Sequence, residues 1–492
     1  MRLGEITRDI GAVRSDADPA LEVTGLAYDS RRVRPGQLFA AIPGFKADGH
    51  DFITAAAEAG ASVALTERWV EGAVIPQVQV PDVRLALALA SAEFYGRPSE
   101  RLKLIGVTGT NGKTTTTHMI QSILEAAGRR SALLGGVEYR IAGKAQPAER
   151  TTPESVDLQQ MLSRAVEGGD RFAVLEVSSH GIELFRAAAL DFDVAVFTNL
   201  TRDHLDLHSD MESYYATKRR LFYNSIAGEQ PESRMPVGVI NIDDAYGARL
   251  AGELAAAGGE VVSFGASSGA LVSAANIVYS GWTTSFDLVT PAGVTAVEIA
   301  IPGSFSLANA LAAAAAAHAL GLAAGEIAAG LKGHRGAPGR FEPVETDAPF
   351  HIVIDYAHNE DGLQRAIDAA RHITPGRLIV VFGCPGERDR DKRPKMGLVA
   401  GKGSDLAILT TDDCYGEPPG QILDAAESGL TSSGSRYLRI ADRREAIRAA
   451  IEAAGPGDTI LIAGKGHETR QIMSSGPVPF SDRQTVLELL AP

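Results

Sequence analysis

"RLKLIGVTGTNGKTTTT", residues 101–117, decides the fold of this chain of 492 residues. The apolar run that ends at Gly106 predicts a buried strand, and the threonine-rich run from Lys113 predicts a helix. The glycines between them let backbone N–H groups and the helix N-terminus face an anion. We therefore expect an ATP site here, with Lys113 on the β- and γ-phosphates and Thr114 or Thr115 on Mg²⁺.

The spacing of this loop differs from that of the common phosphate-binding loop, which has a glycine, four residues and then Gly-Lys-Ser/Thr. Val107 stands where that first glycine belongs, and Gly106 lies one position further back. The alternative is an ordinary glycine-rich turn with a solvated lysine. The strand before the loop and the helix after it favour the phosphate-binding interpretation.

Composition limits the classes of function. The chain has 45% hydrophobic and 22% charged residues, which is typical of a soluble globular protein. A formal net charge of -14 argues against broad binding to nucleic acid or to an anionic membrane. The two cysteines, Cys384 and Cys414, fit a reducing compartment, and no signal pattern opens the sequence. We expect a cytoplasmic protein.

The chain is too long for one core, and its pattern is that of an α/β protein with several domains. Apolar strand-like runs alternate with glycine turns and helical stretches, as expected for parallel sheets. Two linker-like segments, "YGRPSER" and "GHRGAPGR", divide it. We expect domains at residues 1–99, 100–338 and 339–492. The alanine-rich run from Ala310 is too weakly hydrophobic to span a bilayer and predicts a buried helix.

Acidic and histidine side chains follow two further strand-like runs. Glu176 ends the run in "FAVLEVSS", where a second Mg²⁺ ligand belongs beside a phosphate-binding loop. The segment "VAVFTNLTRDHLDLHSD" holds Asp203, His204, Asp206 and His208. This segment suggests a metal or phosphate loop, whereas a polar loop is the preferred interpretation for His208.

The basic run in "YYATKRRLF" contains Lys218, Arg219 and Arg220. Taken by itself, such a run is more typical of a solvated helix face than of a site.

Many of these motifs occur together in one known family. The chain resembles the Mur ligases, the ATP-dependent amide-forming family of peptidoglycan synthesis, and within it the UDP-N-acetylmuramyl-tripeptide synthetases. The resemblance covers nearly the whole chain and includes the longer loop. It rests on "DSRRVRPGQLFAAIPGFKADGHDF", "GVTGTNGKTTTT", "RTTPES", "LEVSSHGIELFR", "FTNLTRDHLDLH", "YYATKRRLF", "GRFEPV", "VIDYAHNEDGL", "FGCPGERDRDKRPKMG" and "AGKGHETRQI".

The resemblance implies a fold of three domains. A central ATPase-like domain with a parallel sheet would lie between an N-terminal UDP-binding α/β domain and a C-terminal Rossmann-like α/β domain that binds the amino acid.

The resemblance also implies roles for residues at the nucleotide. Lys218 matches the lysine that the family carbamylates (N6-carboxylysine), which overturns the interpretation of its run as a solvated face. Catalytic roles would fall to Lys113, Glu176, His204, Lys218 and Lys392, with Thr114, Glu176, His204 and Lys218 at the metals. ATP-binding positions would be Gly109, Thr110, Asn111, Gly112, Lys113, Thr114, Thr115, Asn309, Arg340, Asp355, Tyr356 and His358. Ser306 stands where the family usually has asparagine.

Two further groups of residues match the substrate sites of the family. Those of the UDP-linked precursor would be Asp29, Ser30, Phe45, Lys46, Ala47, Thr151, Thr152, Ser178 and Arg186. Those of the incoming amino acid would be Arg388, Asp412, Asp413, Tyr415, Gly464 and Glu468.

The implied reaction uses ATP and Mg²⁺ to join a free amino acid to UDP-MurNAc-L-Ala-D-Glu. The γ-phosphoryl group would pass to the D-glutamyl side-chain carboxylate, and the α-amine would attack the acyl phosphate. We expect a monomer without nucleic-acid or membrane partners.

The residues for the incoming amino acid depart from the family pattern. Family members that add meso-diaminopimelate carry Asp-Asn-Pro-Arg, whose arginine binds the distal carboxylate. Here the tetrad is Asp412-Asp413-Cys414-Tyr415. A distal carboxylate would lose its cation and meet an extra acid, so lysine or ornithine is favoured. Diaminopimelate stays open if another arginine, such as Arg393 or Arg470, binds that carboxylate.

Two other classes of function stay open. One is a ligase of this fold that acts on a small peptide metabolite outside cell-wall synthesis, against which the retained uridine-site residues argue. The other is a nucleotide-binding regulatory protein without catalysis, against which Lys113, Glu176, His204, Lys218 and Lys392 argue.

Overall fold

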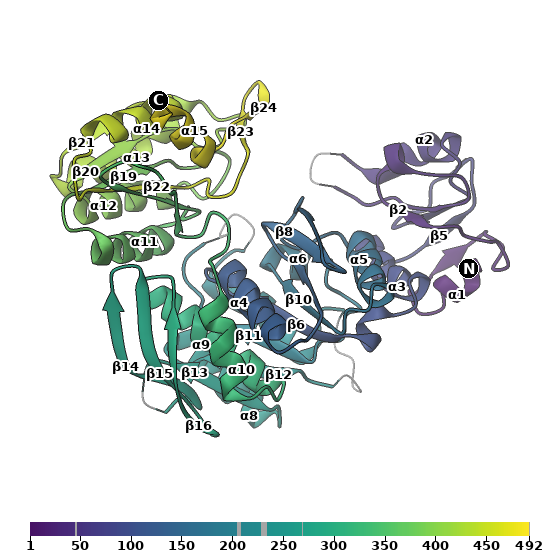
Figure 1. Ribbon diagram of the computed structural model, residues 1–492. Helices are drawn as coiled ribbons and strands as arrows, with labels where there is room; N and C mark the ends of the chain where they lie inside the picture. The colour runs from purple at the N-terminus through teal and green to yellow at the C-terminus, as the bar shows by residue number, and fades with distance from the viewer. Residues whose placement is uncertain (45–46, 204–207, 228–233, 268, 492) are drawn as a thin grey trace.

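The computed structural model describes residues 1–44, 47–203, 208–227, 234–267 and 269–491. Within these residues the chain forms three α/β units, each built on its own sheet, in the order of the sequence (Figure 1). Phe45, Lys46 and His204, to which site roles were assigned, and Asp206 lie outside the described residues. Among the described residues, no helix is long and apolar enough to cross a membrane.

The first unit has a small sheet with the strand order β1-β5-β4-β3-β2, in which only the β1–β5 pair is antiparallel. Its strands are β1 (Arg14–Ser15), β2 (Leu26–Ala27), β3 (Leu38–Ala40), β4 (Val63–Thr66) and β5 (Gln77–Gln79). Its helices are α1 (Leu3–Ile6), α2 (Ile53–Glu58) and α3 (Val83–Phe94), with short 3₁₀ turns at Ser30–Arg32, Gly49–Phe52 and Pro98–Arg101.

The central unit has the largest sheet, with the order β16-β15-β14-β13-β12-β11-β6-β10-β7-β8-β9. From β14 to β7 neighbouring strands are parallel, and antiparallel strands extend both edges, an extension that the sequence did not reveal. The strands are β6 (Lys103–Thr108), β7 (Ser131–Leu134), β8 (Glu138–Ile141), β9 (Lys144–Pro147), β10 (Phe172–Glu176), β11 (Val194–Phe197), β12 (Val237–Asn241), β13 (Val261–Gly265), β14 (Val272–Ser280), β15 (Thr283–Thr290) and β16 (Gly293–Ile299).

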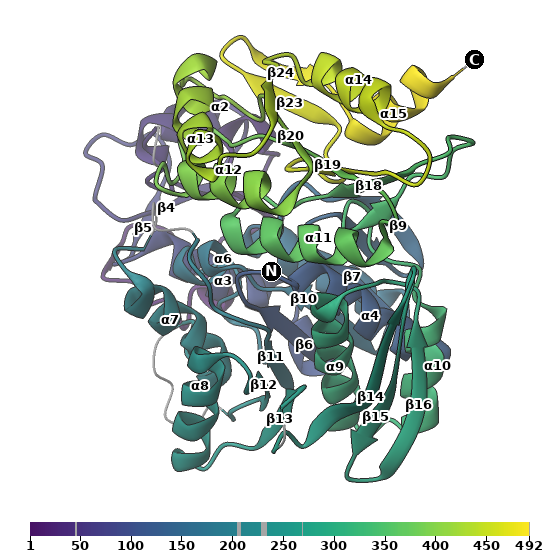
Figure 2. The ribbon, with the colours of Figure 1, turned by 90° about the vertical axis from the view of Figure 1, so that its left-hand side faces the viewer.

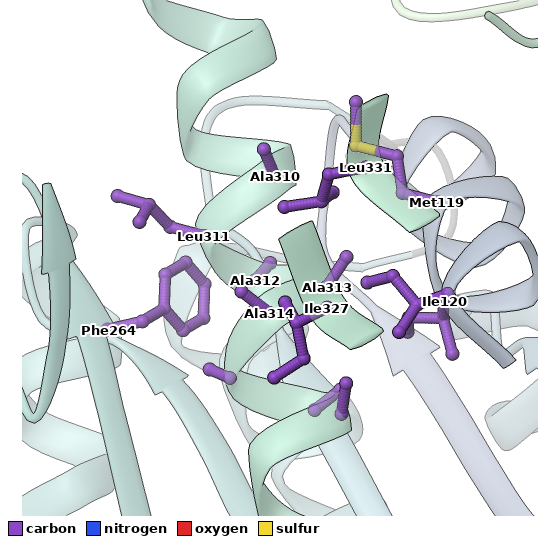
Figure 3. Packing of buried hydrophobic residues seen from close by; sticks show 14 of the residues in the cluster. Met119, Ile120, Phe264, Ala310, Leu311, Ala312, Ala313, Ala314, Ile327 and Leu331 are labelled. Atoms are coloured by element: carbon purple, nitrogen blue, oxygen red, sulfur yellow. The ribbon is translucent and has the colours of Figure 1, made fainter. Parts of the chain in front are cut away.

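Helices cover this sheet and build the largest core. They are α4 (Lys113–Ala126), α5 (Ser155–Glu167), α6 (Ser179–Glu183), α7 (Met211–Arg219), the 3₁₀ turn Arg220–Tyr223, α8 (Ala245–Ala256), α9 (Ser304–Ala319) and α10 (Ala324–Gly333). The alanine-rich run forms α9, whose residues from Ala310 to Ala317 are buried, so the expectation of a buried helix is confirmed. Small side chains let α9 approach Met119 and Ile120 of α4, Leu331 of α10 and Phe264 of β13 (Figure 3).

The third unit has a sheet with the order β17-β18-β22-β19-β20-β21, parallel except at β17. Its strands are β17 (Glu342–Pro343), β18 (His351–Asp355), β19 (Leu378–Phe382), β20 (Leu406–Leu409), β21 (Tyr437–Arg439) and β22 (Thr459–Ala463), with a separate hairpin of β23 (Arg470–Met473) and β24 (Gly476–Pro479). Its helices are α11 (Glu360–Ile373), α12 (Lys392–Gly403), α13 (Pro419–Ser433), α14 (Arg443–Ala453) and α15 (Asp482–Leu490).

The third unit lies against the central one, with α11 at the boundary between them (Figure 2). Asp361 of α11 accepts a hydrogen bond of 2.9 Å from the Asn111 side chain in the glycine-rich loop. On the other side, Trp282 in the β14–β15 turn packs edge-on against His351, with ring centroids 5.4 Å apart. These contacts bring the carboxyl ends of strands from two sheets to one shared space, where ligands of parallel α/β sheets bind.

Candidate functional site

A cleft of about 760 Å³ lies where the central and third units meet. Its walls come from the glycine-rich loop, the end of β10, the start of α9 and the loops of the third sheet. The structure brings most of the residues assigned from the sequence to this cleft, namely Thr110, Asn111, Gly112, Lys113, Thr114, Thr115, Thr151, Thr152, Glu176, Ser178, Arg186, Asn309, Arg340, Asp355, Tyr356, His358, Arg388, Lys392, Asp412, Asp413, Tyr415, Gly464 and Glu468.

The glycine-rich loop is shaped by its own backbone and by the end of β11. Gly112 has a φ of +86°, and a Cβ atom there would lie 2.3 Å from Oδ1 of Asn309, so glycine is required on both counts. The Thr198 hydroxyl donates to the Asn111 carbonyl at 2.7 Å, and the Asn199 side chain accepts from the Asn111 N–H at 2.9 Å. Asn199 was not assigned a role from the sequence, because its signal was only a polar residue after a strand.

Two lysines converge on one carbonyl of this loop. The Nζ of Lys113 donates to Gly109 O at 2.9 Å, and the Nζ of Lys218 donates to the same oxygen at 3.0 Å. Lys218 is 1% exposed, so a solvated helix face does not describe its position. Lys113 lines the cleft, whereas Gly109 and Lys218 do not, so Lys218 reaches the loop from the side away from the cleft.

Burial sets the charge of these lysines. It lowers the pKa of Lys113, and it lowers the pKa of Lys218 well below that of an ordinary lysine, with the charge of Lys113 acting in the same direction. An amine of low pKa is available in its neutral form, which is the form that reacts with CO₂.

Oxygen ligands suited to Mg²⁺ lie beside the loop. The Glu176 carboxyl is buried and accepts the Gly136 N–H at 2.8 Å, which fixes its position at the end of β10. The Thr114 hydroxyl accepts a hydrogen bond of 3.2 Å from Arg340 of the third unit. A carboxylate and a hydroxyl beside a phosphate-binding loop are the donor types that Mg²⁺ prefers, so the described residues fit the ion.

Residues of the third unit close one side of the cleft. The Arg340 guanidinium lies 4.2 Å from the ring centre of Tyr356. Asp355 accepts the N–H groups of Phe341 and Ala357, and burial raises its pKa. The Nδ1–H of His358 donates to the Tyr356 carbonyl at 2.9 Å.

Two residues of α9 at this end of the cleft differ in their roles. Asn309 lines the cleft, whereas the Ser306 hydroxyl donates to Pro302 O within its own helix start at 2.9 Å.

The residues assigned to the UDP-linked precursor fall into two places. Thr151, Thr152, Ser178 and Arg186 line the cleft, and Arg186 lies 3.0 Å from a carboxylate oxygen of Glu154. Burial lowers the pKa of Arg186. The other described members do not line the cleft and lie in the first unit, namely Asp29, Ser30 and Ala47.

The wall assigned to the incoming amino acid contains a lysine that the sequence reasoning missed. Asp413 was expected to face an incoming ammonium group. It lines the cleft, and its Oδ1 accepts from the Lys465 Nζ at 2.8 Å and from the Ile472 N–H at 2.9 Å. Lys465 also donates to Glu468 at 2.6 Å and lies 3.6 Å from Asp412. The signal was available in "AGKGHE", where a lysine directly follows an apolar strand.

The two arginines considered as alternative partners for a distal carboxylate are placed differently. Arg393 is buried and donates to both carboxylate oxygens of Glu417 at 2.8 Å, so it is already paired. Arg470 is exposed on β23 and does not line the cleft. Arg388 does line it, 5.8 Å from the ring centre of Tyr415.

This fold and site define a nucleotide-binding α/β protein whose site is completed by a second α/β unit. Comparison with known families makes the class more specific. Residues 22–95 match the description "Mur ligase family, catalytic domain", residues 107–317 "Mur ligase middle domain", and residues 339–466 "Mur ligase, glutamate ligase domain".

Relatives match over the full length of the chain. A Geobacter metallireducens protein named UDP-N-acetylmuramoyl-L-alanyl-D-glutamate–2,6-diaminopimelate ligase is 44% identical, covering 99% of this chain and 98% of the relative. A solved structure of a ligase of that name is 32% identical with a TM-score of 0.68, covering 100% of this chain and 98% of its own. Thermotoga maritima MurF, solved with ADP, shares the fold at 20% identity and a TM-score of 0.66. The match covers 95% of this chain and 96% of the MurF chain. The chain belongs to the Mur ligase family.

Proposed function

We propose that this chain is an ATP-dependent ligase that joins an amino acid to UDP-MurNAc-L-Ala-D-Glu in peptidoglycan synthesis. The observation that supports this most is the shared cleft, which joins the phosphate-binding loop of the central unit to Arg388, Asp413 and Glu468 of the third unit. The names of the relatives agree with the reaction and with the precursor. They give no support to a role on small peptide metabolites outside cell-wall synthesis.

The three units, with boundaries near residues 99 and 338, would divide the reaction. The first unit would hold the uridine end of the precursor through Asp29, Ser30, Phe45, Lys46 and Ala47. Thr151, Thr152, Ser178 and Arg186 would hold the sugar-peptide in the cleft, where Arg186 offers a planar fork for a carboxylate or phosphate.

Lys113, the backbone N–H groups of residues 109–112 and the N-terminus of α4 would bind the phosphates of ATP. Thr114, Glu176, His204 and a carbamylated Lys218 would hold Mg²⁺, which offsets the repulsion between the phosphates and the carboxylate. The position of Lys218 behind Gly109 supports its assignment, and the lowered pKa agrees with it.

The chemistry needs a leaving group better than hydroxide. The D-glutamyl side-chain carboxylate would take the γ-phosphoryl group of ATP, with Lys392 beside the transferred group. The α-amine of the incoming amino acid would displace phosphate and form the amide. Arg388 would hold the α-carboxylate, and approach of the third unit would align amine and acyl carbon. Because ATP, the UDP-linked precursor and the amino acid are all water-soluble, the reaction would take place in the cytoplasm.

The test is a reconstituted reaction. Purified protein, UDP-MurNAc-L-Ala-D-Glu, ATP and Mg²⁺ should yield a tripeptide product, ADP and phosphate when an amino acid is added, as measured by mass spectrometry and a phosphate assay. ATP binding without turnover with any amino acid would favour a regulatory protein. ATP turnover on other peptides, combined with no UDP binding, would favour the small-metabolite ligase.

A further inference from the structure

A buried lysine holds three carboxylates at one wall of the cleft. Lys465, two positions after the end of β22, has no measurable solvent exposure. Its Nζ donates to Asp413 at 2.8 Å and to Glu468 at 2.6 Å, and it lies 3.6 Å from Asp412. These residues come from two segments about 50 positions apart in the sequence, so Lys465 joins the loop after β20 to the loop after β22.

The three carboxylates line the cleft, whereas Lys465 lies behind them. Three carboxylates against one ammonium leave an excess of two negative charges when all are ionised. Arg443 lies behind the same wall, but it donates to both carboxylate oxygens of Asp482 at 2.7 and 2.8 Å and adds no net charge. The surface that faces the cleft is therefore acidic. We call these four residues the acidic wall: Asp412, Asp413, Glu468 and Lys465.

Two arginines near this wall are paired with other carboxylates. Arg393 is held by Glu417, and Arg365 is held by Asp361 at 3.0 Å. Arg388 lies beside Tyr415, where it can bind one carboxylate of an amino acid. Within the described residues, the side of the cleft around Asp413 thus offers acid groups to a second functional group of the acceptor.

We propose that Lys465 is a positioning residue that fixes Asp413 and Glu468 as an acidic wall, and that this wall selects an acceptor with a second ammonium group and no second carboxylate. The inference rests on the proposed function and adds the class of amino acid to it. A second ammonium group would gain from the excess negative charge, and a second carboxylate would be repelled by it. This selection would distinguish the chain from relatives named for 2,6-diaminopimelate.

Four amino acids test the selection. Lysine and ornithine carry the second ammonium, norleucine has nearly the shape of lysine without it, and meso-diaminopimelate adds a second carboxylate. With saturating ATP and UDP-MurNAc-L-Ala-D-Glu, we expect kcat/KM for lysine or ornithine to exceed that for norleucine and for diaminopimelate by about tenfold or more. A kcat/KM for diaminopimelate or for norleucine equal to that for lysine would overturn the inference and leave the proposed function intact. No product with any of the four would overturn both.

Substitution of Asp413 tests the wall itself. Asp413→Asn keeps the size of the side chain and an oxygen that accepts the Ile472 N–H. We expect the preference for lysine over norleucine to fall by about threefold or more while the KM for ATP is kept, because one charge is lost. Asp424→Asn, on the exposed surface of α13, is the matched control. An unchanged preference in Asp413→Asn would overturn the role of the wall.

Substitution of Lys465 tests positioning. Lys465→Met should raise the KM for lysine more than the KM for ATP, because the carboxylates repel one another and move apart. Adding Asp413→Asn to Lys465→Met restores the excess of two negative charges, and we expect the preference for lysine over norleucine to recover. If the double variant prefers lysine over norleucine no more than Lys465→Met does, Lys465 acts by packing alone. If neither Lys465 variant folds, the result with Asp413→Asn decides.

Discussion

The glycine-rich loop and the acidic wall face the same cleft, and each has a buried lysine in an opposite electrostatic environment. Lys218 donates to backbone and hydroxyl oxygens behind Gly109, and burial lowers its pKa well below the usual value. Burial also acts to lower the pKa of Lys465, but Asp412, Glu468 and Asp413 outweigh it and raise that pKa. Equal burial therefore does not determine charge; the partners of the buried group do.

On the side of the glycine-rich loop, catalysis should depend on Lys113 more than on any surface lysine. Lys113→Ala is expected to lower kcat for product formation by about a hundredfold or more, because a cation at the transferred phosphate is lost. The protein should stay folded, since among the described residues Lys113 donates to the loop carbonyls of Gly109 and Thr110. Circular dichroism and the coupled ADP assay measure the two effects, and Lys144→Ala on the exposed strand β9 is the control. Undiminished turnover would refute the phosphate-binding assignment.

Lys218 sharpens the contrast, because we expect it to become an anion by carbamylation. Lys218→Ala should be nearly inactive, with partial rescue by a short carboxylic acid in solution. In bicarbonate buffer, the mass of the intact wild-type protein should be greater by that of CO₂. A wild-type rate for Lys218→Ala would contradict the idea. Missing rescue by itself would not, since the added acid needs to reach a buried position.

The same substitution at both lysines should have different effects on stability. Lys465→Met is expected to cost about 3 kcal/mol at neutral pH, because it leaves buried carboxylates without their cation. Lys218→Met, in buffer without bicarbonate or metal, should cost less than about 1 kcal/mol, because the amine it removes is already disfavoured as a cation. Denaturant unfolding monitored by fluorescence and circular dichroism measures both, and equal costs would contradict the comparison.

The pH dependence of Lys465→Met follows from the same charges. Burial acts to raise the pKa of Asp412, but Lys465, together with Arg443, the Asp413 N–H and His358, lowers it, whereas burial raises the pKa of Glu468 despite Lys465. Without the lysine, the folded-state pKa values of these carboxyls should lie above their unfolded values. The folded variant then binds more protons than the unfolded one, so its deficit should shrink as pH falls from about 7 to about 5.

The smallest expected effect concerns the amino acid. Asp413→Asn combined with Tyr415→Arg should shift preference from lysine or ornithine towards meso-diaminopimelate by about tenfold, if one charge contact worth about 1.4 kcal/mol is reversed. Competition assays with the three amino acids measure it, with Tyr415→Phe as the control that keeps the ring and adds no charge. Preference for diaminopimelate in the unmodified protein would mean that another cation binds its distal carboxylate.

The relation between sequence and structure differs between these two regions as well. The loop was predictable because its geometry is local: strand, glycines and helix follow one another, and the N–H groups that bind phosphate belong to the same few residues. The burial of the alanine-rich helix was predictable for a similar reason, since its composition alone excludes a solvated face. The family resemblance supplied residue roles, and the cleft brings most of the described ones together.

The charges around the acidic wall could not be predicted in this way. Asp413 was interpreted as an open acid, and Arg393 as an available cation. Lys465, more than 50 positions away, pairs with Asp413, and Glu417 pairs with Arg393. The antiparallel edges of the central sheet were likewise hidden, because alternation of side chains does not specify which strand a segment pairs with.

The sequence by itself determined the phosphate-binding loop, the α/β class and the family, because these depend on contiguous residues and their order. Only the tertiary structure decided which charges remain available in the cleft, because each depends on a partner brought from a distant segment. Electrostatic energy depends on the distance between charged groups and on their burial, and neither quantity can be read from positions along the chain.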